Sequence, residues 1–234
     1  MQAKKIKKQK YTIISLGGSL IVPDNVDIKF LKNFRNIIVK YTRNSRKFII
    51  ICGGGRMARM YQNSARKINI LTNKDLDWLG IYVTKVNAYL LKAIFGKYVQ
   101  ENILTNPERD RVNKKSKIII ASGWRPGAST DYDAILLAKR FKTEVINLTD
   151  IKYVYDKDPD IYKSAKPLKK ISWGELKSII GNKWRPGLNL PFDPLASREA
   201  NLHDLRAVIL KGCDLNNLER YLSGKRFSGT IIEN

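Results

Sequence analysis

The sequence has little of the material from which disulfide-rich, metal-binding and membrane proteins are built. Its 234 residues include two cysteines and one histidine. Cys52 and Cys213 are far apart in the chain, so they form neither a disulfide framework nor the spacing of metal ligands. No apolar run has the length of a membrane span, and Gly17 and Gly18 interrupt the apolar segment 11–22 that could resemble a signal peptide. We therefore expect a soluble protein of the reducing cytoplasm.

Acidic residues are also scarce. The chain has 21 Asp and Glu against 44 Lys and Arg, a formal net charge of +23. This charge attracts polyanions, and nucleic acid is one such ligand. Only residues 1–10 form a dense basic cluster, however, and no helix-turn-helix, zinc-finger or RNP-type pattern occurs. We expect residues 1–10 to be a basic extension and nucleic acid to be a secondary partner, since a phosphorylated small substrate would be attracted as well.

Short β-rich runs alternate with segments of helical spacing along the chain. The runs expected to form strands are 11–16, 47–53, 117–123, 143–148 and 206–212. The segments expected to form helices are 28–41, 57–68, 76–94, 132–141, 173–180 and 194–201. This alternation predicts an α/β fold with a mostly parallel sheet and helices on both faces.

Three of the expected strands end in loops of glycine or other small residues, each of which opens a helix. They are LGGS at 16–19, GGGR at 53–56 and SGWRPGAST at 122–130. Ligands of open parallel sheets bind at the carboxyl ends of the strands, where helix N-termini favour anions. A single Gly-Gly is more often a tight turn, and residues 129–131 would serve equally as helix caps. The three loops together indicate a site for several phosphates, although neither a Walker A nor a dinucleotide motif occurs.

Six blocks, taken in order and spacing, resemble the amino acid kinase family and, within it, the archaeal-type uridylate kinases. The blocks are LGGSLIVP, ICGGGRMARMY, DLDWLGIYVTKVNAYLL, GWRPGASTDYDAILLA, LTDIKYVYDKDP and FDPLA. The resemblance implies one three-layer α/β/α domain over residues 11–234, with UMP bound by the N-terminal part and ATP by the C-terminal part. It further implies phosphoryl transfer from ATP to UMP with Mg²⁺, and a homo-oligomer, a hexamer built from dimers.

The resemblance also implies roles for individual residues. The catalytic set is Gly18, Arg59 and Asp131. UMP would contact Gly54, Asp77, Trp124, Arg125, Pro126, Gly127, Ala128, Ser129 and Thr130. ATP would contact Gly18, Ser19, Gly55, Arg59, Thr149, Asp150, Tyr155 and Asp158. Asp77 would accept from the ribose hydroxyls, which suits a carboxylate. Asp193 would cap a helix or organise the phosphate site, and no residue is expected to form a dedicated metal site.

Two positions depart from the family pattern. Ser15 stands where many relatives carry a lysine on the transferring phosphate, and Asp150 stands where relatives usually have asparagine. The missing positive charge would have to come from another side chain, and Arg59 is the first candidate. Further candidates are Arg56, Lys157 and Arg198.

Three alternatives remain open from the sequence. An isopentenyl phosphate kinase would need a histidine soon after the triple glycine, where this chain has Arg-Met-Ala-Arg. A nucleotide sensor without activity would explain Ser15, and a nucleic-acid-binding protein would explain the charge. The lone His203 is interpreted as a surface residue, because an ionised nucleotide phosphate needs no catalytic base. A second WRPG, at 184–187, is interpreted as a coincidental loop.

Overall fold

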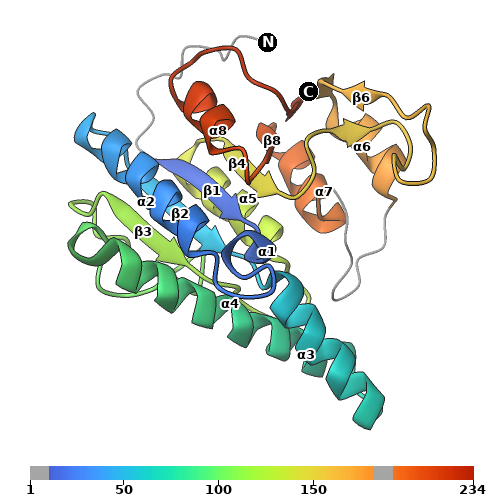
Figure 1. Ribbon diagram of the computed structural model, residues 1–234, viewed down its shortest axis with the longest axis horizontal. Helices are drawn as coiled ribbons and strands as arrows, with labels where there is room; N and C mark the ends of the chain where they lie inside the picture. Colours follow the sequence, from blue (N-terminus) through green and yellow to red (C-terminus); the bar gives the residue numbers. More distant parts are fainter. Residues whose placement is uncertain (1–10, 182–191) are drawn as a thin grey trace.

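The computed structural model describes residues 11–181 and 192–234, so the basic extension and the second WRPG segment lie outside the described residues (Figure 1). The main sheet has seven strands in the order β3-β2-β1-β4-β8-β9-β7. Its strands are β1 (Thr12–Leu16), β2 (Phe48–Cys52), β3 (Ile118–Ala121), β4 (Val145–Thr149), β7 (Lys170–Ile171), β8 (Ala207–Lys211) and β9 (Thr230–Ile232). A separate hairpin pairs β5 (Val154–Tyr155) with β6 (Pro167–Leu168).

Eight α-helices connect the strands in the described part of the chain. They are α1 (Gly18–Ile21), α2 (Ile28–Arg43), α3 (Gly55–Ile68), α4 (Asn73–Phe95), α5 (Thr130–Phe141), α6 (Trp173–Ile180), α7 (Pro194–Leu202) and α8 (Leu215–Leu222). A short 3₁₀ turn, η1 (Gly96–Tyr98), follows α4. Within these residues, no helix combines the length and the apolar character needed to cross a membrane.

Successive side chains of the central strands point to opposite faces, which gives the molecule two apolar clusters. Ile14, together with the alternate residues of its neighbouring strands, packs with α2, α4 and α8. Ile13 and its counterparts pack with α5, α6 and α7. Figure 1 shows α2 and α4 on the near face of the sheet and α5 behind it. Both faces are buried, which is why these strands are mostly apolar and rich in β-branched residues instead of alternating regularly with polar ones.

The α/β fold is confirmed, and a strand or helix lies in every segment where one was expected. Helix α8 and the far edge of the sheet, where β9 runs antiparallel to β8, were not predicted. Strand β9 has only three residues, too few for periodicity to distinguish it from a loop. Helix α4 begins at Asn73, before the expected Leu76, because Thr72 and Asp75 form a capping box.

The order of the parallel strands places a ligand crevice between β1 and β4. From β1 the chain moves outward to β2 and β3, and then returns to the other side of β1 with β4. Loops on the two sides of such a switch point diverge and leave room for a ligand at the carboxyl ends of the strands. The register pairs Ser15 of β1 with Asn147 of β4, so these two polar residues lie side by side below the crevice.

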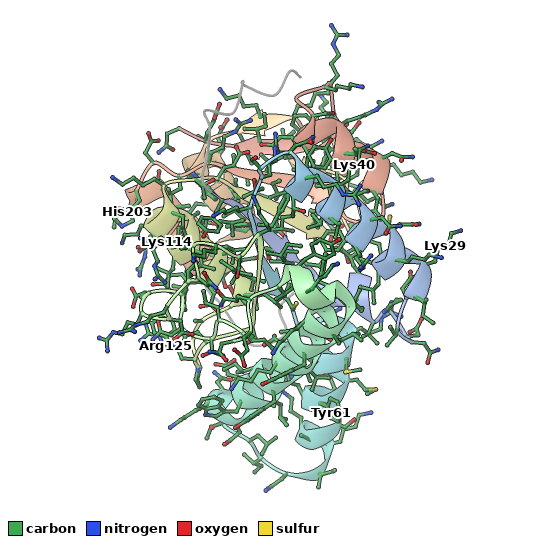
Figure 2. The ribbon with its side chains drawn as sticks, turned by 90° about the vertical axis from the view of Figure 1, so that its left-hand side faces the viewer. Lys29, Lys40, Tyr61, Lys114, Arg125 and His203 are labelled. Carbon is green, nitrogen blue, oxygen red and sulfur yellow. The ribbon has the colours of Figure 1, made fainter. Side chains whose placement is uncertain are left out.

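The positive charge is distributed over the surface. Figure 2 shows Lys29 and Lys40 on one side of the molecule in that view, and Lys114 and Arg125 on the other.

Candidate active site

The first two glycine loops are pressed together, backbone against backbone. A Cβ placed on Gly18 would lie 2.4 Å from the Gly53 carbonyl oxygen and 2.5 Å from the Gly55 nitrogen. Gly55 has a φ of +60°, and a Cβ there would lie 2.2 Å from the Ser19 nitrogen. Only glycine can occupy these two positions, because any side chain would separate the loops.

Side chains from α3 and α4 hold this double loop in place. Asn87 of α4 donates to the Gly53 carbonyl at 2.8 Å. The Ser19 hydroxyl accepts from the Arg56 backbone at 3.0 Å and from Arg59 Nη2 at 3.4 Å. The guanidinium of Arg59 therefore lies over the point where the N-termini of α1 and α3 meet, where an anion is favoured.

A pocket of about 200 Å³ opens at this place, above the switch point of the sheet. It gathers residues from β1 and β4, from the loop after β2, and from α1, α3 and the start of α5. The lining residues are Ser15, Gly17, Gly18, Ser19, Leu20, Gly53, Gly54, Gly55, Arg59, Thr130, Asp131, Asn147, Thr149 and Asp150. The three residues expected to be catalytic, Gly18, Arg59 and Asp131, thus meet in one pocket.

Asp131 lies at the floor of this pocket in a network that joins three segments of the chain. Ser15 Oγ donates to Asp131 Oδ1 at 2.9 Å. Burial, together with the nearby Asp193 carboxylate, raises the pKa of Asp131 from its ordinary 3.8 to about 7, although the bond from Ser15 and the backbone N–H of Asp193 both favour the charged form. Asp131 therefore titrates near neutral pH in the protein without ligands.

Asp193 connects α7 to the start of α5. It is the N-cap of α7, and its Oδ1 accepts from the Ala196 N–H at 2.7 Å. The hydroxyl of Ser129, the N-cap of α5, favours the charged form of its carboxylate. Burial raises the pKa of Asp193, and its Oδ2 has no hydrogen-bond partner among the described residues. Both functions suggested for this residue, helix cap and organiser of the site, are compatible with this position.

The loop 124–130, expected to hold UMP, is tied to α4 and α5. Asp77 of α4 accepts from the Gly127 N–H through Oδ2 at 2.7 Å. Burial raises the pKa of Asp77, and the bond from Gly127 partly offsets the rise. The second carboxylate oxygen of Asp77 remains available to a ligand such as a ribose diol. Arg125 stacks over the Trp124 ring, with its guanidinium carbon 4.0 Å from the ring centroid.

Four residues expected on the ATP side divide into two pairs. Thr149 and Asp150 line the pocket, where the Thr149 hydroxyl donates to Asp150 Oδ1 at 3.1 Å. Tyr155 and Asp158 belong to the β5–β6 hairpin and do not line it. The Asp158 carboxylate caps its own turn by accepting from the Asp160 N–H at 2.9 Å. Contact of the hairpin residues with ATP stays a prediction.

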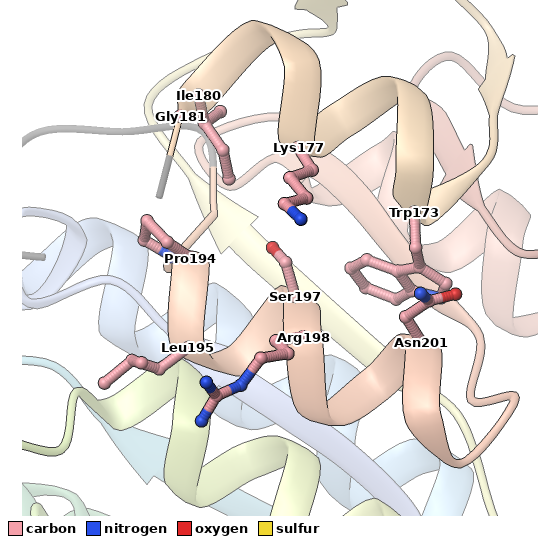
Figure 3. Close-up of a pocket in the computed structure, with 9 residues that line it drawn as sticks. All are labelled: Trp173, Lys177, Ile180, Gly181, Pro194, Leu195, Ser197, Arg198 and Asn201. Atoms are coloured by element: carbon pink, nitrogen blue, oxygen red, sulfur yellow. The ribbon is translucent and has the colours of Figure 1, made fainter. Parts of the chain in front are cut away.

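The four cations proposed to supply the positive charge that Ser15 lacks differ in their surroundings. Arg59 lines the pocket. Arg56 pairs with Asp24 at 2.6 Å on the surface, and Lys157 lies in the exposed part of the β5–β6 hairpin. Arg198 lies with Lys177 in a separate groove of about 270 Å³ between α6 and α7 (Figure 3). Of these four cations, Arg59 is thus the one that lines the pocket.

Several residues of the site were missed in the sequence, because their roles depend on contacts between distant segments. Asn147 of β4 lines the pocket, and Thr84 and Asn87 are buried polar residues of α4 that bind the neighbouring loops. Thr84 Oγ1 accepts from the Gly123 N–H at 2.8 Å, just before the loop 124–130. Asn87 belongs to the LGI…NA block, so the block itself was a usable signal. His203, as expected, is exposed, at the end of α7 beside Glu199.

Fold and pocket together define a phosphate-binding α/β enzyme scaffold, and comparison with known proteins identifies its family. Residues 10–211 match the amino acid kinase family, and the chain belongs to this family. It is similar to the uridylate kinases of Thermoplasma volcanium and Thermoplasma acidophilum, with 34% identity to each over 94% of this chain and 96% of theirs.

Solved structures give the same result. The crystal structure of uridylate kinase from Archaeoglobus fulgidus aligns with a TM-score of 0.79 and 26% identity, over 94% of this chain and 99% of that one. The UMP kinase of Bacillus anthracis shares the fold, with a TM-score of 0.73 at 19% identity. The resemblance to the archaeal uridylate kinases is confirmed.

Proposed function

We propose that this chain is a uridylate kinase, which transfers the γ-phosphoryl group of ATP to UMP and releases ADP and UDP. The observation that carries the proposal is the meeting of two glycine loops, Arg59 and Asp131 in one pocket, next to a loop tied to Asp77. This arrangement offers backbone amides and one cation for phosphates, with a carboxylate placed for a ribose. Full-length similarity to uridylate kinases supports the choice of UMP.

The chain's task in this reaction is to position two nucleotides and neutralise charge. The UMP phosphate oxygen attacks the γ-phosphorus as the bond to the β–γ bridging oxygen breaks, and the transferring group carries negative charge throughout. Backbone amides at the starts of α1 and α3 and the Arg59 guanidinium face that charge. The loop 124–130 holds the acceptor. Asp77 binds the backbone of this loop, and Ser129 at its end caps α5. No general base is needed, since the attacking phosphate is already ionised.

Mg²⁺ is the proposed cofactor, and the residues present fit it. Asp131 lines the pocket and the Asp193 carboxylate lies near it, and Asp193 Oδ2 is buried without a partner in the described part of the chain. Carboxylates and phosphates are typical magnesium ligands. The described residues contain no group of three His, Cys, Asp or Glu that could hold a metal. When bound, the ion would neutralise phosphate charge.

The assay is ADP formation by the purified protein with ATP and Mg²⁺ and one of five acceptors. These are UMP, CMP, dUMP, isopentenyl phosphate and N-acetylglutamate. We expect turnover with UMP far above that with the other four. Turnover confined to isopentenyl phosphate would make the chain an isopentenyl phosphate kinase. ATP binding without turnover on any acceptor would favour the sensor, and would mean that Ser15 cannot replace the lysine of its relatives.

We further propose that the protein is a homo-oligomer, a hexamer assembled from dimers. Helix α4 supports a dimer, because four large side chains, Trp78, Tyr82, Val86 and Tyr89, are exposed at intervals of four, four and three residues. They form one stripe along the helix. A stripe of this kind is typical of a surface that is covered in an assembly. Light scattering on the wild type and on Tyr82→Lys tests it, with a smaller assembly expected for the variant.

A further inference from the structure

Asp133 is a buried carboxyl group that no step of the proposed reaction uses. It lies one turn into α5, and the residue is 1% exposed. Its Oδ2 accepts from the Trp124 backbone N–H at 3.0 Å, across nine residues of chain. Its Oδ1 has no hydrogen-bond partner among the described residues. The next residues of α5, Ala134 and Ile135, belong to the apolar cluster on this side of the sheet.

A buried carboxyl group at this position lowers the stability of the folded protein. The contact that it makes with the loop 124–130 is therefore the feature that distinguishes it from an apolar side chain. Burying a polar atom without a partner is unfavourable, and burial also raises the pKa of Asp133 well above its ordinary value. An apolar side chain of the same size would pack against the same cluster without these costs. What an apolar side chain could not do is accept from Trp124, whose N–H would then lose its partner.

The bond to Trp124 is one of three that fix the main chain at the start of the UMP loop. In each bond a side-chain oxygen accepts from a backbone N–H of this segment. The pairs are Thr84 with Gly123, Asp133 with Trp124 and Asp77 with Gly127. Two of these side chains come from α4 and one from α5. The loops proposed to hold the ATP phosphates, after β1 and β2, have other supports, namely Asn87 and Ser19.

We infer that Asp133 is a positioning residue for the phosphoryl acceptor: its bond to Trp124 fixes the loop 124–130 in the conformation that binds UMP. The inference rests on the proposed function for the identity of the acceptor. A side chain that acts only on this loop should alter the KM for UMP while leaving the KM for ATP in place. A side chain that only stabilises α5 would reduce the amount of folded enzyme and leave both KM values unchanged.

The test uses three variants of Asp133. Asp133→Asn keeps an oxygen that can accept from Trp124. Asp133→Ala and Asp133→Val remove it, and valine restores most of the volume, so that a folded variant is obtained even if the alanine variant fails. Asp110→Ala is the matched control, because Asp110 also accepts backbone N–H groups in a loop, those of Thr105 and Asn106, away from the pocket.

The first readout is hydrogen exchange at the Trp124 amide, which needs no substrate. We expect faster exchange in Asp133→Ala and Asp133→Val and wild-type exchange in Asp133→Asn and Asp110→Ala. The second readout is steady-state kinetics. The alanine and valine variants should raise the KM for UMP about tenfold, which corresponds to one lost hydrogen bond of about 1.4 kcal/mol, with the KM for ATP within twofold. Asp133→Asn should stay within twofold for both.

Distinct results overturn the inference and the proposed function. A wild type that does not phosphorylate UMP overturns the proposed function, and the role of Asp133 toward UMP with it. If the wild type phosphorylates UMP and Asp133→Val keeps the wild-type KM for UMP, the proposed function stands and the inference is wrong. Equal increases in both KM values, or a defect in Asp133→Asn as large as in Asp133→Val, also contradict it.

Discussion

The hydroxyl of Ser15 donates to the carboxylate of Asp131 at 2.9 Å and joins β1 to the first turn of α5 across 116 residues of sequence. Ser15 stands at the position where the family resemblance implies a lysine. Burial and the nearby Asp193 carboxylate raise the pKa of Asp131 to about 7, and the bond from Ser15, which favours the charged carboxylate, offsets this rise only in part. The ionisation of the pocket floor is therefore sensitive to pH in the neutral range.

Replacing Ser15 with alanine should move the pH dependence of catalysis. The bond from Ser15 favours the charged carboxylate, so its loss raises the pKa of Asp131 further, by about 0.7 unit for a bond of about 1 kcal/mol. If ionised Asp131 is the active form, the acid limb of kcat/KM for ATP shifts upward by that amount. Activity on this limb then falls about fivefold. Ser15→Thr keeps the hydroxyl and should keep the wild-type profile.

Comparing Ser15→Ala with the wild type cancels the effect of substrate ionisation on the pH profile. ATP and UMP titrate identically in both assays, so only the difference between the two profiles reports on the protein. Coincident acid limbs for the wild type and Ser15→Ala would contradict the role of Asp131.

Asp131→Asn should stabilise the ligand-free protein at high pH while abolishing activity. The pKa of Asp131 is higher in the folded state, about 7, than its ordinary value of 3.8, so the folded state binds the proton more tightly. The free energy of unfolding is therefore greatest below the lower value and decreases as the pH rises through the upper one. Asparagine cannot ionise, and the gain in Tm over the wild type should be larger at pH 8 than at pH 5.

Thermal melts at the two pH values, with kcat measured in parallel, check this prediction. Asp160→Asn changes the net charge by the same amount at an exposed site in the β5–β6 hairpin, and should show no such pH-dependent gain. A gain for Asp131→Asn that is equal at both pH values would mean that Asp131 is already ionised throughout the range.

Asp77→Ala should weaken UMP binding specifically. The substitution removes the partner of the Gly127 N–H and the proposed acceptor of the ribose hydroxyls. Hydrogen bonds to charged groups contribute about 1.5–3 kcal/mol, so the KM for UMP should rise about 10- to 100-fold, and the preference for UMP over dUMP should diminish. Asp75→Ala is the control two residues away: it breaks the cap of α4, costs about 1 kcal/mol of stability and leaves the KM for UMP unchanged. An unaltered ratio of UMP to dUMP turnover in Asp77→Ala would exclude ribose recognition by Asp77.

Arg59 and Arg56 should differ sharply although they are three residues apart on α3. Arg59→Ala removes the pocket's cation, and kcat should fall about 100-fold or more, the loss usual for a group that stabilises transition-state charge. Arg56→Ala removes a surface ion pair with Asp24 and should change kcat less than threefold. Measurements of kcat at saturating ATP and UMP distinguish the two, and a larger loss for Arg56→Ala would identify that residue as the phosphate ligand instead.

The sequence by itself determined the layers of the fold and the loops that make the site. Continuous β-branched runs required strands buried on both faces, and the glycines after β1 and β2 are positions where only the absence of a Cβ permits the observed contact. These are local properties, which residue type and spacing indicate directly. The family resemblance, which rests on six such blocks, then implied Gly18, Arg59 and Asp131 as one set.

Tertiary structure decided which side chains meet. Ser15 faces Asp131, Asp77 binds Gly127 and Asp133 binds Trp124 because the strand order reverses at β1 and brings α4 and α5 to the same edge of the sheet. No local pattern encodes such pairs, because each joins segments whose distance depends on the packing of all the elements between them. The raised pKa of Asp131 is likewise a property of the assembled pocket, since burial and the approach of Asp193 exist only after the chain has folded.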